Sequence, residues 1–173
     1  RSGRRETSTV IIAPVTVYGA RSVTVSGYEG WYLGGRAMTL KDAGSLGGAE
    51  LDLYAGYGIA LDLATSIDLG VMYYVFPDGE GETDYVEPYA SISHQIGPVL
   101  GTVGAKYAPD QDALGGGDSL YLFSEVEAAI PTLPVTAIAG IGRQEAGLGA
   151  SYWNWSLGAR YARGPFVASL RYV

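Results

Sequence analysis

Apolar residues alternate with polar or small residues along most of the chain, which is the period of a β-strand with two different faces. In residues 49–60, Leu51, Leu53 and Tyr57 fall on one face, and Glu50 and Asp52 fall on the other. The same alternation returns in residues 66–75, 86–93, 99–107, 121–128, 135–141, 153–161 and 166–172. Because stretches with a helical period are hard to find, the pattern predicts an all-β protein.

The connections between these segments alternate in length. Short turns are predicted near residues 27–30, 61–64, 95–98, 130–134 and 163–165, and longer glycine-rich, mostly acidic loops near residues 41–48, 77–83, 109–117 and 144–151. Short periplasmic turns and long extracellular loops are typical of outer-membrane barrels, so we expect an antiparallel up-and-down transmembrane β-barrel of about 10–12 strands. One domain is expected over residues 1–173, with residues 1–7 as a flexible tail.

Two places interrupt the regular pattern. Residues 8–26 fit either one long strand or a tight hairpin turning at Gly19 and Ala20. Pro88 lies inside a predicted strand, and since proline donates no hydrogen bond it predicts a bulge or a local break there.

Alternation alone also fits a soluble barrel with an apolar interior. Three features favour the opposite sidedness, with the apolar face toward lipid. That face carries no charge in the middle of these strands, where Arg or Lys would cost about 2–4 kcal/mol at the bilayer midplane. The other face combines glycine, tyrosine and charge, which suits a crowded interior. Aromatic residues near the strand ends predict two girdles at the lipid headgroups: Trp31, Tyr57 and Tyr161 on the short-turn side, and Tyr73, Tyr107, Trp153 and Trp155 on the long-loop side.

Composition narrows the function classes. The formal net charge is -7, which argues against a nucleic-acid partner, because such proteins usually carry a basic stripe. There is no cysteine, which excludes disulfides and thiolate chemistry. No apolar run approaches the roughly 20 residues of a transmembrane helix. Because the strand faces predict a transmembrane barrel, the expected partners are outer-membrane lipids and lipopolysaccharide, in the outer membrane of Gram-negative bacteria.

From Gly27 to Val173 the chain resembles the TorF-like family of outer-membrane porins. The segments that carry the resemblance are residues 30–34 (GWYLG), 50–57 (ELDLYAGY), 73–77 (YYVFP), 84–90 (DYVEPYA), 106–109 (KYAP) and 153–159 (WNWSLGA). The resemblance implies an exported barrel of about twelve strands. It implies no particular substrate. The family pattern leads us to expect a closing strand after Val173 that this sequence does not contain; truncation, a divergent start, or a partner chain at the strand edge near Val173 would each explain the difference. An odd strand count would leave the carboxyl end on the long-loop side.

The inward face holds the candidate functional residues. They are the lumen-lining acids and bases Arg36, Glu50, Asp52, Asp68, Glu87, Lys106, Glu125, Glu127, Arg160 and Arg171. One interpretation is an ion-pair lattice that fills the lumen, because unpaired buried charges are strongly disfavoured. The other is a narrow water-filled path whose charges select solutes, with the acidic excess favouring cations.

We expect no enzyme activity and no cofactor. His94 is the only histidine and shares the apolar register near a short turn, whereas Ser91 and Ser93 fall on the opposite face, so a catalytic triad is not predicted. The loop acids Asp78 to Asp84 lack the calcium-loop spacing and predict a solvated surface. Two functional hypotheses follow: porin-like passive diffusion of small solutes, or a plugged structural or interaction barrel that packs with partner chains and transports nothing.

Overall fold

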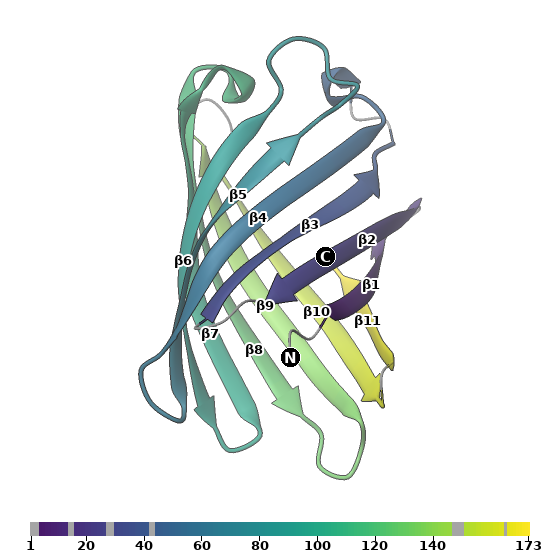
Figure 1. The fold of residues 1–173 in the computed structure, drawn as a ribbon, viewed down its shortest axis with the longest axis vertical. Helices are drawn as coiled ribbons and strands as arrows, with labels where there is room; N and C mark the ends of the chain where they lie inside the picture. Colours follow the sequence, from purple (N-terminus) through teal and green to yellow (C-terminus); the bar gives the residue numbers. More distant parts are fainter. Residues whose placement is uncertain (1–3, 14–15, 27–29, 42–43, 147–150, 165) are drawn as a thin grey trace.

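The described residues form a closed barrel of eleven strands, which are inclined to the barrel axis (Figure 1). The computed structural model describes residues 4–13, 16–26, 30–41, 44–146, 151–164 and 166–173. The strands are β1 (Arg4–Ala13), β2 (Thr16–Ser26), β3 (Trp31–Thr39), β4 (Ala49–Ala60), β5 (Thr65–Val75), β6 (Tyr85–Ile96), β7 (Val99–Gln111), β8 (Gly117–Ala129), β9 (Val135–Ala146), β10 (Tyr152–Arg163) and β11 (Phe166–Tyr172). Two short 3₁₀ helices, η2 (Gly44–Leu46) and η3 (Asp112–Leu114), lie in the long loops.

Nine strands, β3 to β11, form a continuous antiparallel up-and-down sheet, in which each strand pairs with the next along the chain. The hairpin β1–β2 extends it, since β2 pairs with β3. Strand β1 then closes the barrel by pairing with β11, from Ser8 opposite Ala168 to Ile11 opposite Arg171. This last pairing is parallel, because an odd number of alternating strands brings the first and the last together in the same direction.

The barrel has two different ends, as the alternation of turns predicts. Figure 1 shows the long loops β3–β4, β5–β6 and β7–β8 at the top and tight turns such as β4–β5 and β6–β7 at the bottom. Gly97 in the β6–β7 turn has φ +56°, a left-handed conformation that suits a two-residue hairpin. The predicted all-β, antiparallel up-and-down barrel is confirmed, and its eleven strands fall within the expected range.

Several boundaries differ from the sequence prediction. The amino-terminal segment is a hairpin, but β1 ends at Ala13 and β2 begins at Thr16, so Gly19 and Ala20 lie inside β2. Residues 4–7, expected in the flexible tail, belong to β1, and residues 1–3 lie outside the described residues. The predicted loops at 109–117 and 144–151 begin later, because β7 continues to Gln111 and β9 to Ala146. The predicted edge of β11 is paired with β1 over Ala168–Arg171.

Large apolar residues lie on the outer surface. Leu33, Leu53, Val103, Leu157 and Leu170 are all exposed, whereas the apolar residues buried among the described side chains are Phe76, Ala108 and Ile138. Asp52, by contrast, is completely buried. This sidedness is the reverse of that in a soluble barrel, where the apolar face of each strand fills the interior. Within the described residues no helix is both long and apolar enough to cross a membrane.

Pro88 does not interrupt β6, but the β6–β7 ladder ends beside it. Pairing with β7 begins at Tyr89 opposite Lys106, although Pro88 keeps its register with Val71 of β5. Beyond it, the Gln111 side chain takes the place of a backbone partner: Val86 N donates to Gln111 Oε1 (2.8 Å) and Gln111 Nε2 donates to Val86 O (3.0 Å). The predicted local break is therefore an interruption of the β6–β7 ladder, where the Gln111 side-chain amide supplies the missing hydrogen bonds to Val86.

Candidate functional site: the barrel lumen

Every basic residue predicted to line the lumen is in an ion pair. Arg36 Nη2 lies 2.5 Å from Asp52 Oδ2, Lys106 Nζ lies 3.2 Å from Glu87 Oε1, and Arg171 Nη2 lies 2.6 Å from Glu125 Oε2. Arg160 pairs with Glu127. The structure thus brings eight of the ten predicted lumen charges together in four pairs.

Two of these pairs join strands that are not neighbours. Glu127 on β8 reaches Arg160 on β10, and Glu125 on β8 reaches Arg171 on β11. Neighbouring strands lie about 4.8 Å apart, so β8 and β11 are separated by about 14 Å along the wall. A side-chain contact over that span is possible only as a chord through the concave side of the barrel.

Glycines on the intervening strands leave room for the Arg171–Glu125 chord. On β9, a Cβ at Gly140 would lie 3.7 Å from Glu125 Oε2 and 2.9 Å from Ser156 Oγ. On β10, a Cβ at Gly158 would lie 3.4 Å from Arg171 Cβ. The arginine therefore passes β10 at Gly158 and reaches Glu125 past Gly140 of β9, two inward positions that carry no side chain.

A second bridge of side chains joins β3, β5 and β6. Tyr32 Oη donates to Asp68 Oδ1 at 2.7 Å, and the hydroxyls of Tyr32 and Tyr89 are hydrogen-bonded to each other. Both rings lie over glycine: a Cβ at Gly56 would collide with the Tyr32 hydroxyl, and one at Gly70 with the Tyr89 hydroxyl. Since Gly56 and Gly70 are register partners on β4 and β5, the two tyrosines meet above a wall without side chains.

Asp52 is the most buried charge of the lumen. Its side chain is 1% exposed, and its Oδ2 accepts from both Arg36 Nε (2.7 Å) and Nη2. Its Oδ1 receives no hydrogen bond from the described residues. Asp52 therefore depends on Arg36 for its charge compensation.

Glu50 and Asp68 are the two predicted lumen acids that form no salt bridge with the described residues. Asp68 is stabilised by the Tyr32 hydroxyl instead. On the side of β4 and β5, the described residues thus hold two acids without a basic partner.

Two cavities open along the wall formed by β6 to β11. The first, of about 250 Å³, lies at the long-loop end and is lined by Tyr85, Glu87, Ala108, Leu114, Gly117, Asp118, Ser119 and Gln144. The second, of about 210 Å³, is lined by Lys106, Tyr121, Phe123, Ser124, Glu125, Gly140, Ile141, Asn154, Ser156 and Arg171. Each is large enough to hold several water molecules.

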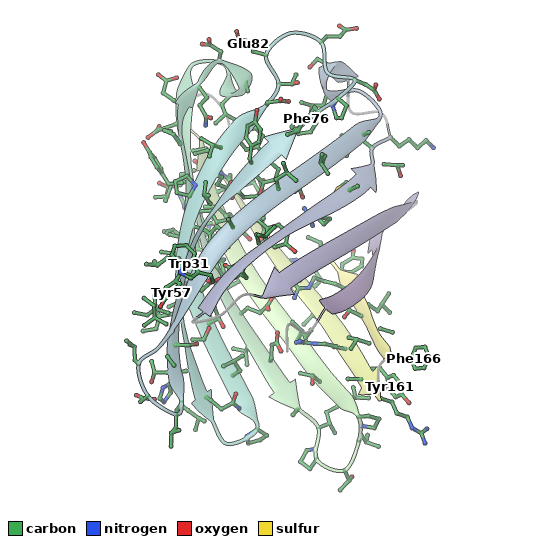
Figure 2. All side chains as sticks on the ribbon, in the orientation of Figure 1. Trp31, Tyr57, Phe76, Glu82, Tyr161 and Phe166 are labelled. Carbon is green, nitrogen blue, oxygen red and sulfur yellow. The ribbon has the colours of Figure 1, made fainter. Side chains whose placement is uncertain are left out.

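The predicted girdle aromatics lie on the outer surface. Trp31 at the start of β3 packs against Tyr57 of β4, with ring centroids 4.8 Å apart, and Figure 2 shows the two side by side. Tyr161 lies near the β10–β11 turn beside the exposed Phe166 (Figure 2). Tyr73, Tyr107, Trp153 and Trp155 are also exposed. Their contact with lipid stays a prediction.

His94 belongs to a polar cluster at the β4–β5 turn. Asp62 Oδ1 accepts from the backbone N of Ala64 and Thr65, both at 2.7 Å, and Thr65 Oγ1 donates to Asp62 Oδ2 at 3.0 Å. With the Thr65 hydroxyl donating to Asp62, the His94 tautomer that fits this geometry donates from Nδ1 to Thr65 Oγ1 across 2.9 Å. In this geometry His94 stabilises the β4–β5 turn. To act as a general base it would have to accept a proton from the Thr65 hydroxyl.

Uncharged polar residues also organise the lumen; inward tyrosines such as Tyr121 were expected from the sequence, whereas Tyr32, Tyr89, Ser119, Gln144 and Asn154 were not. Tyr121 Oη donates to Asn154 Oδ1 (3.0 Å), Gln144 Nε2 donates to Ser119 Oγ, and Tyr32 and Tyr89 bridge to Asp68. All occupy the inward register. The signal that points to the tyrosines is an inward tyrosine whose cross-strand partner is glycine, as in Tyr32 opposite Gly56 and Tyr89 opposite Gly70.

Comparisons with known proteins agree with the fold. The family model described as "Bacterial protein of unknown function (Gcw_chp)" matches residues 15–173. Among solved structures, the chain is similar to one described as "NanC porin structure in rhombohedral crystal form", with a TM-score of 0.65 and 13% sequence identity over 95% of this chain and 80% of that chain. No curated protein matches the chain. The finer resemblance to the TorF-like porins stays a prediction.

Proposed function

Because the chain belongs to the Gcw_chp family of bacterial proteins of unknown function, we propose its function from its own geometry: an outer-membrane barrel of Gram-negative bacteria that passes small solutes by passive diffusion. The observation that carries the proposal is the sidedness of the wall. Leucine, valine and tryptophan face outward, while charged residues face a lumen that contains two cavities. An exposed apolar surface of this extent suits lipid, and the exposed aromatics suit contact with lipid headgroups and lipopolysaccharide.

The partial exposure of the ion pairs supports a water-filled lumen. The side chains of Arg36, Lys106, Arg160 and Arg171 are 30–37% exposed although each is paired. A lumen filled by side chains alone would leave such groups little access to solvent. Asp68, which has no basic partner among the described residues, supports a preference for cations, because carboxylates in the wall of a pore attract cations.

Planar-bilayer recording of the purified protein tests this function. We expect reproducible single-channel conductance in KCl, and a reversal potential under a salt gradient that indicates preference for K⁺ over Cl⁻. A barrel that inserts, as shown by protease protection in vesicles, but conducts no current would contradict passive diffusion.

The cross-lumen contacts support a second function, a plugged barrel with a structural or interaction role. The Arg171–Glu125 chord and the Tyr32–Tyr89 bridge both occupy the interior. For a plugged barrel we expect no conductance, and we expect gentle detergent extraction to recover a stable complex with a partner chain. The two functions are distinguished by the same recording, because plugging and diffusion predict opposite outcomes.

A further inference from the structure

The two cavities lie next to each other along the β7 and β8 part of the barrel wall. On β8 the first cavity touches Gly117, Asp118 and Ser119, and the second begins at Tyr121. On β7 the first touches Ala108 and the second touches Lys106. Successive inward positions on a strand are two residues apart, so no inward residue of β7 or β8 lies between the two linings.

One ion pair stands on this boundary. Glu87 lines the first cavity, Lys106 lines the second, and Lys106 Nζ lies 3.2 Å from Glu87 Oε1. Glu87 Oε1 also accepts a longer hydrogen bond from Tyr74 Oη (3.4 Å). The Glu127–Arg160 and Asp52–Arg36 pairs line neither cavity. The Glu87–Lys106 pair therefore has a position that no other lumen pair of the described residues shares.

We propose that Glu87 and Lys106 are the specificity-determining residues of the lumen, and that a small ion moving between the two cavities passes between or beside their charged groups. The proposal rests on the proposed function, since it assigns the charge selection of that same path. A paired carboxylate and ammonium nearly cancel each other for a passing ion. Removing either one exposes the other, at close range and in a lumen where water screens charge less than in bulk.

The two single substitutions must therefore act in opposite directions. In Lys106→Met the Glu87 carboxylate is left without its ammonium, and the K⁺-to-Cl⁻ permeability ratio should rise severalfold over that of the unsubstituted protein. In Glu87→Gln the Lys106 ammonium is left free, and the ratio should fall severalfold. The double variant should return close to the original ratio, because the site is again neutral.

Arg143→Met is the matched control. Arg143 pairs with Glu145 (2.7 Å) and stacks over the outward Trp153, so this substitution also strands a carboxylate but outside the lumen. The experiment records reversal potentials in a KCl gradient for all five proteins, with heat-modified mobility in SDS gels to show that each barrel is folded.

The outcomes separate the two claims. Opposite shifts in the two single variants, with none in Arg143→Met, support the proposal. Conductance in the unsubstituted protein with equal or like-signed shifts in the two variants overturns the proposal and leaves passive diffusion standing. An unsubstituted barrel that conducts nothing overturns both.

Discussion

The hydroxyl of Tyr32 on β3 is hydrogen-bonded to the hydroxyl of Tyr89 on β6, across the two strands that lie between them. Since Tyr32 donates its own proton to Asp68 Oδ1, Tyr89 is the donor between the two tyrosines. The contact exists because Gly56 and Gly70 place no side chain beneath the rings. Aromatic rings lying over sheet glycines cover backbone that would otherwise be exposed.

Gly56→Ala should destabilise the barrel by about 1–3 kcal/mol, as overpacking does in close-packed sites. The new Cβ would collide with the Tyr32 hydroxyl and lie 2.8 Å from the backbone oxygen of Leu69, which cannot swing away. Gly58→Ala is the control on the same strand and face, since its Cβ would meet only Gly30 O at 3.9 Å. Urea unfolding in lipid vesicles measures both, and equal stabilities of the two variants would contradict the packing argument.

Arg36→Met should cost about 3–5 kcal/mol, because it strands the buried Asp52 carboxylate. Arg160→Met should cost about 1 kcal/mol or less, since its partner Glu127 is 24% exposed and can be solvated. The double variant Arg36→Met, Asp52→Asn should recover part of the loss. If it is no more stable than Arg36→Met in the same unfolding assay, the stranded charge is not the cause.

Leu157→Arg should destabilise the inserted barrel by about 2–4 kcal/mol, the cost of arginine at the bilayer midplane. Leu157 is central in β10 and 57% exposed on the outer surface. Leu63→Arg, on a fully exposed residue of the β4–β5 turn, is the control and should be nearly neutral. The free energy of unfolding in lipid vesicles is measured for both variants. If neither substitution changes it, the outer face of the barrel does not contact hydrocarbon.

The three tryptophans give a depth measurement. Trp31, Trp153 and Trp155 are all exposed on the outer surface. Trp155 lies two residues further into β10 than Trp153, about 6.7 Å along the strand. In single-tryptophan variants reconstituted with lipids brominated at different chain positions, deep bromines should quench Trp155 more than Trp153. If no brominated lipid quenches the tryptophan fluorescence, Trp31, Trp153 and Trp155 lie outside the bilayer.

The β4–β5 turn should lose stability in acid. The pKa of Asp62 is lowered mainly by the backbone N–H of Ala64, and further by the hydroxyl and N–H of Thr65. A depressed folded-state pKa means that the carboxylate stabilises the fold above its unfolded pKa of about 3.9, and that this contribution is lost as the pH falls through the lower folded value. Asp62→Asn should therefore show a shallower loss of melting temperature between neutral and acidic pH than the unsubstituted protein. Parallel pH profiles would exclude Asp62 as a contributor.

The strands and their faces were predictable because a two-residue period is a local signal. The alternation around Leu51 and Asp52 predicts which side chains of β4 face outward and which face the lumen, and the other central strands show the same alternation. The turns were predictable for the same reason, except where tertiary contacts extend a strand. Strand β7 continues past Pro109 because Gln111 pairs with Gly117 of β8 after a bulge and its side chain bonds to Val86 on β6, which no local pattern encodes.

The partners inside the lumen were not predictable from the sequence. Glu125 and Arg171 were both expected to face inward, but they are 46 residues apart and meet only because the wall curves. Which acid pairs with which base depends on the stagger between strands, and a period of two leaves that stagger undetermined. The amino-terminal hairpin was misplaced because Gly19 and Ala20 look like turn residues, whereas the fold accommodates both within β2.

The chord from Arg171 to Glu125 has a mechanical consequence. A β-barrel wall is a single layer of chain, and such a tube resists bending across its hydrogen bonds only weakly, so its cross-section can flatten under lateral pressure from the surrounding medium. The Arg171–Glu125 pair is a strut between β11 and β8, and any flattening of the cross-section that moves these two strands apart must break the ion pair. Arg171 thus limits how far the wall between β8 and β11 can open, in addition to compensating the charge of Glu125.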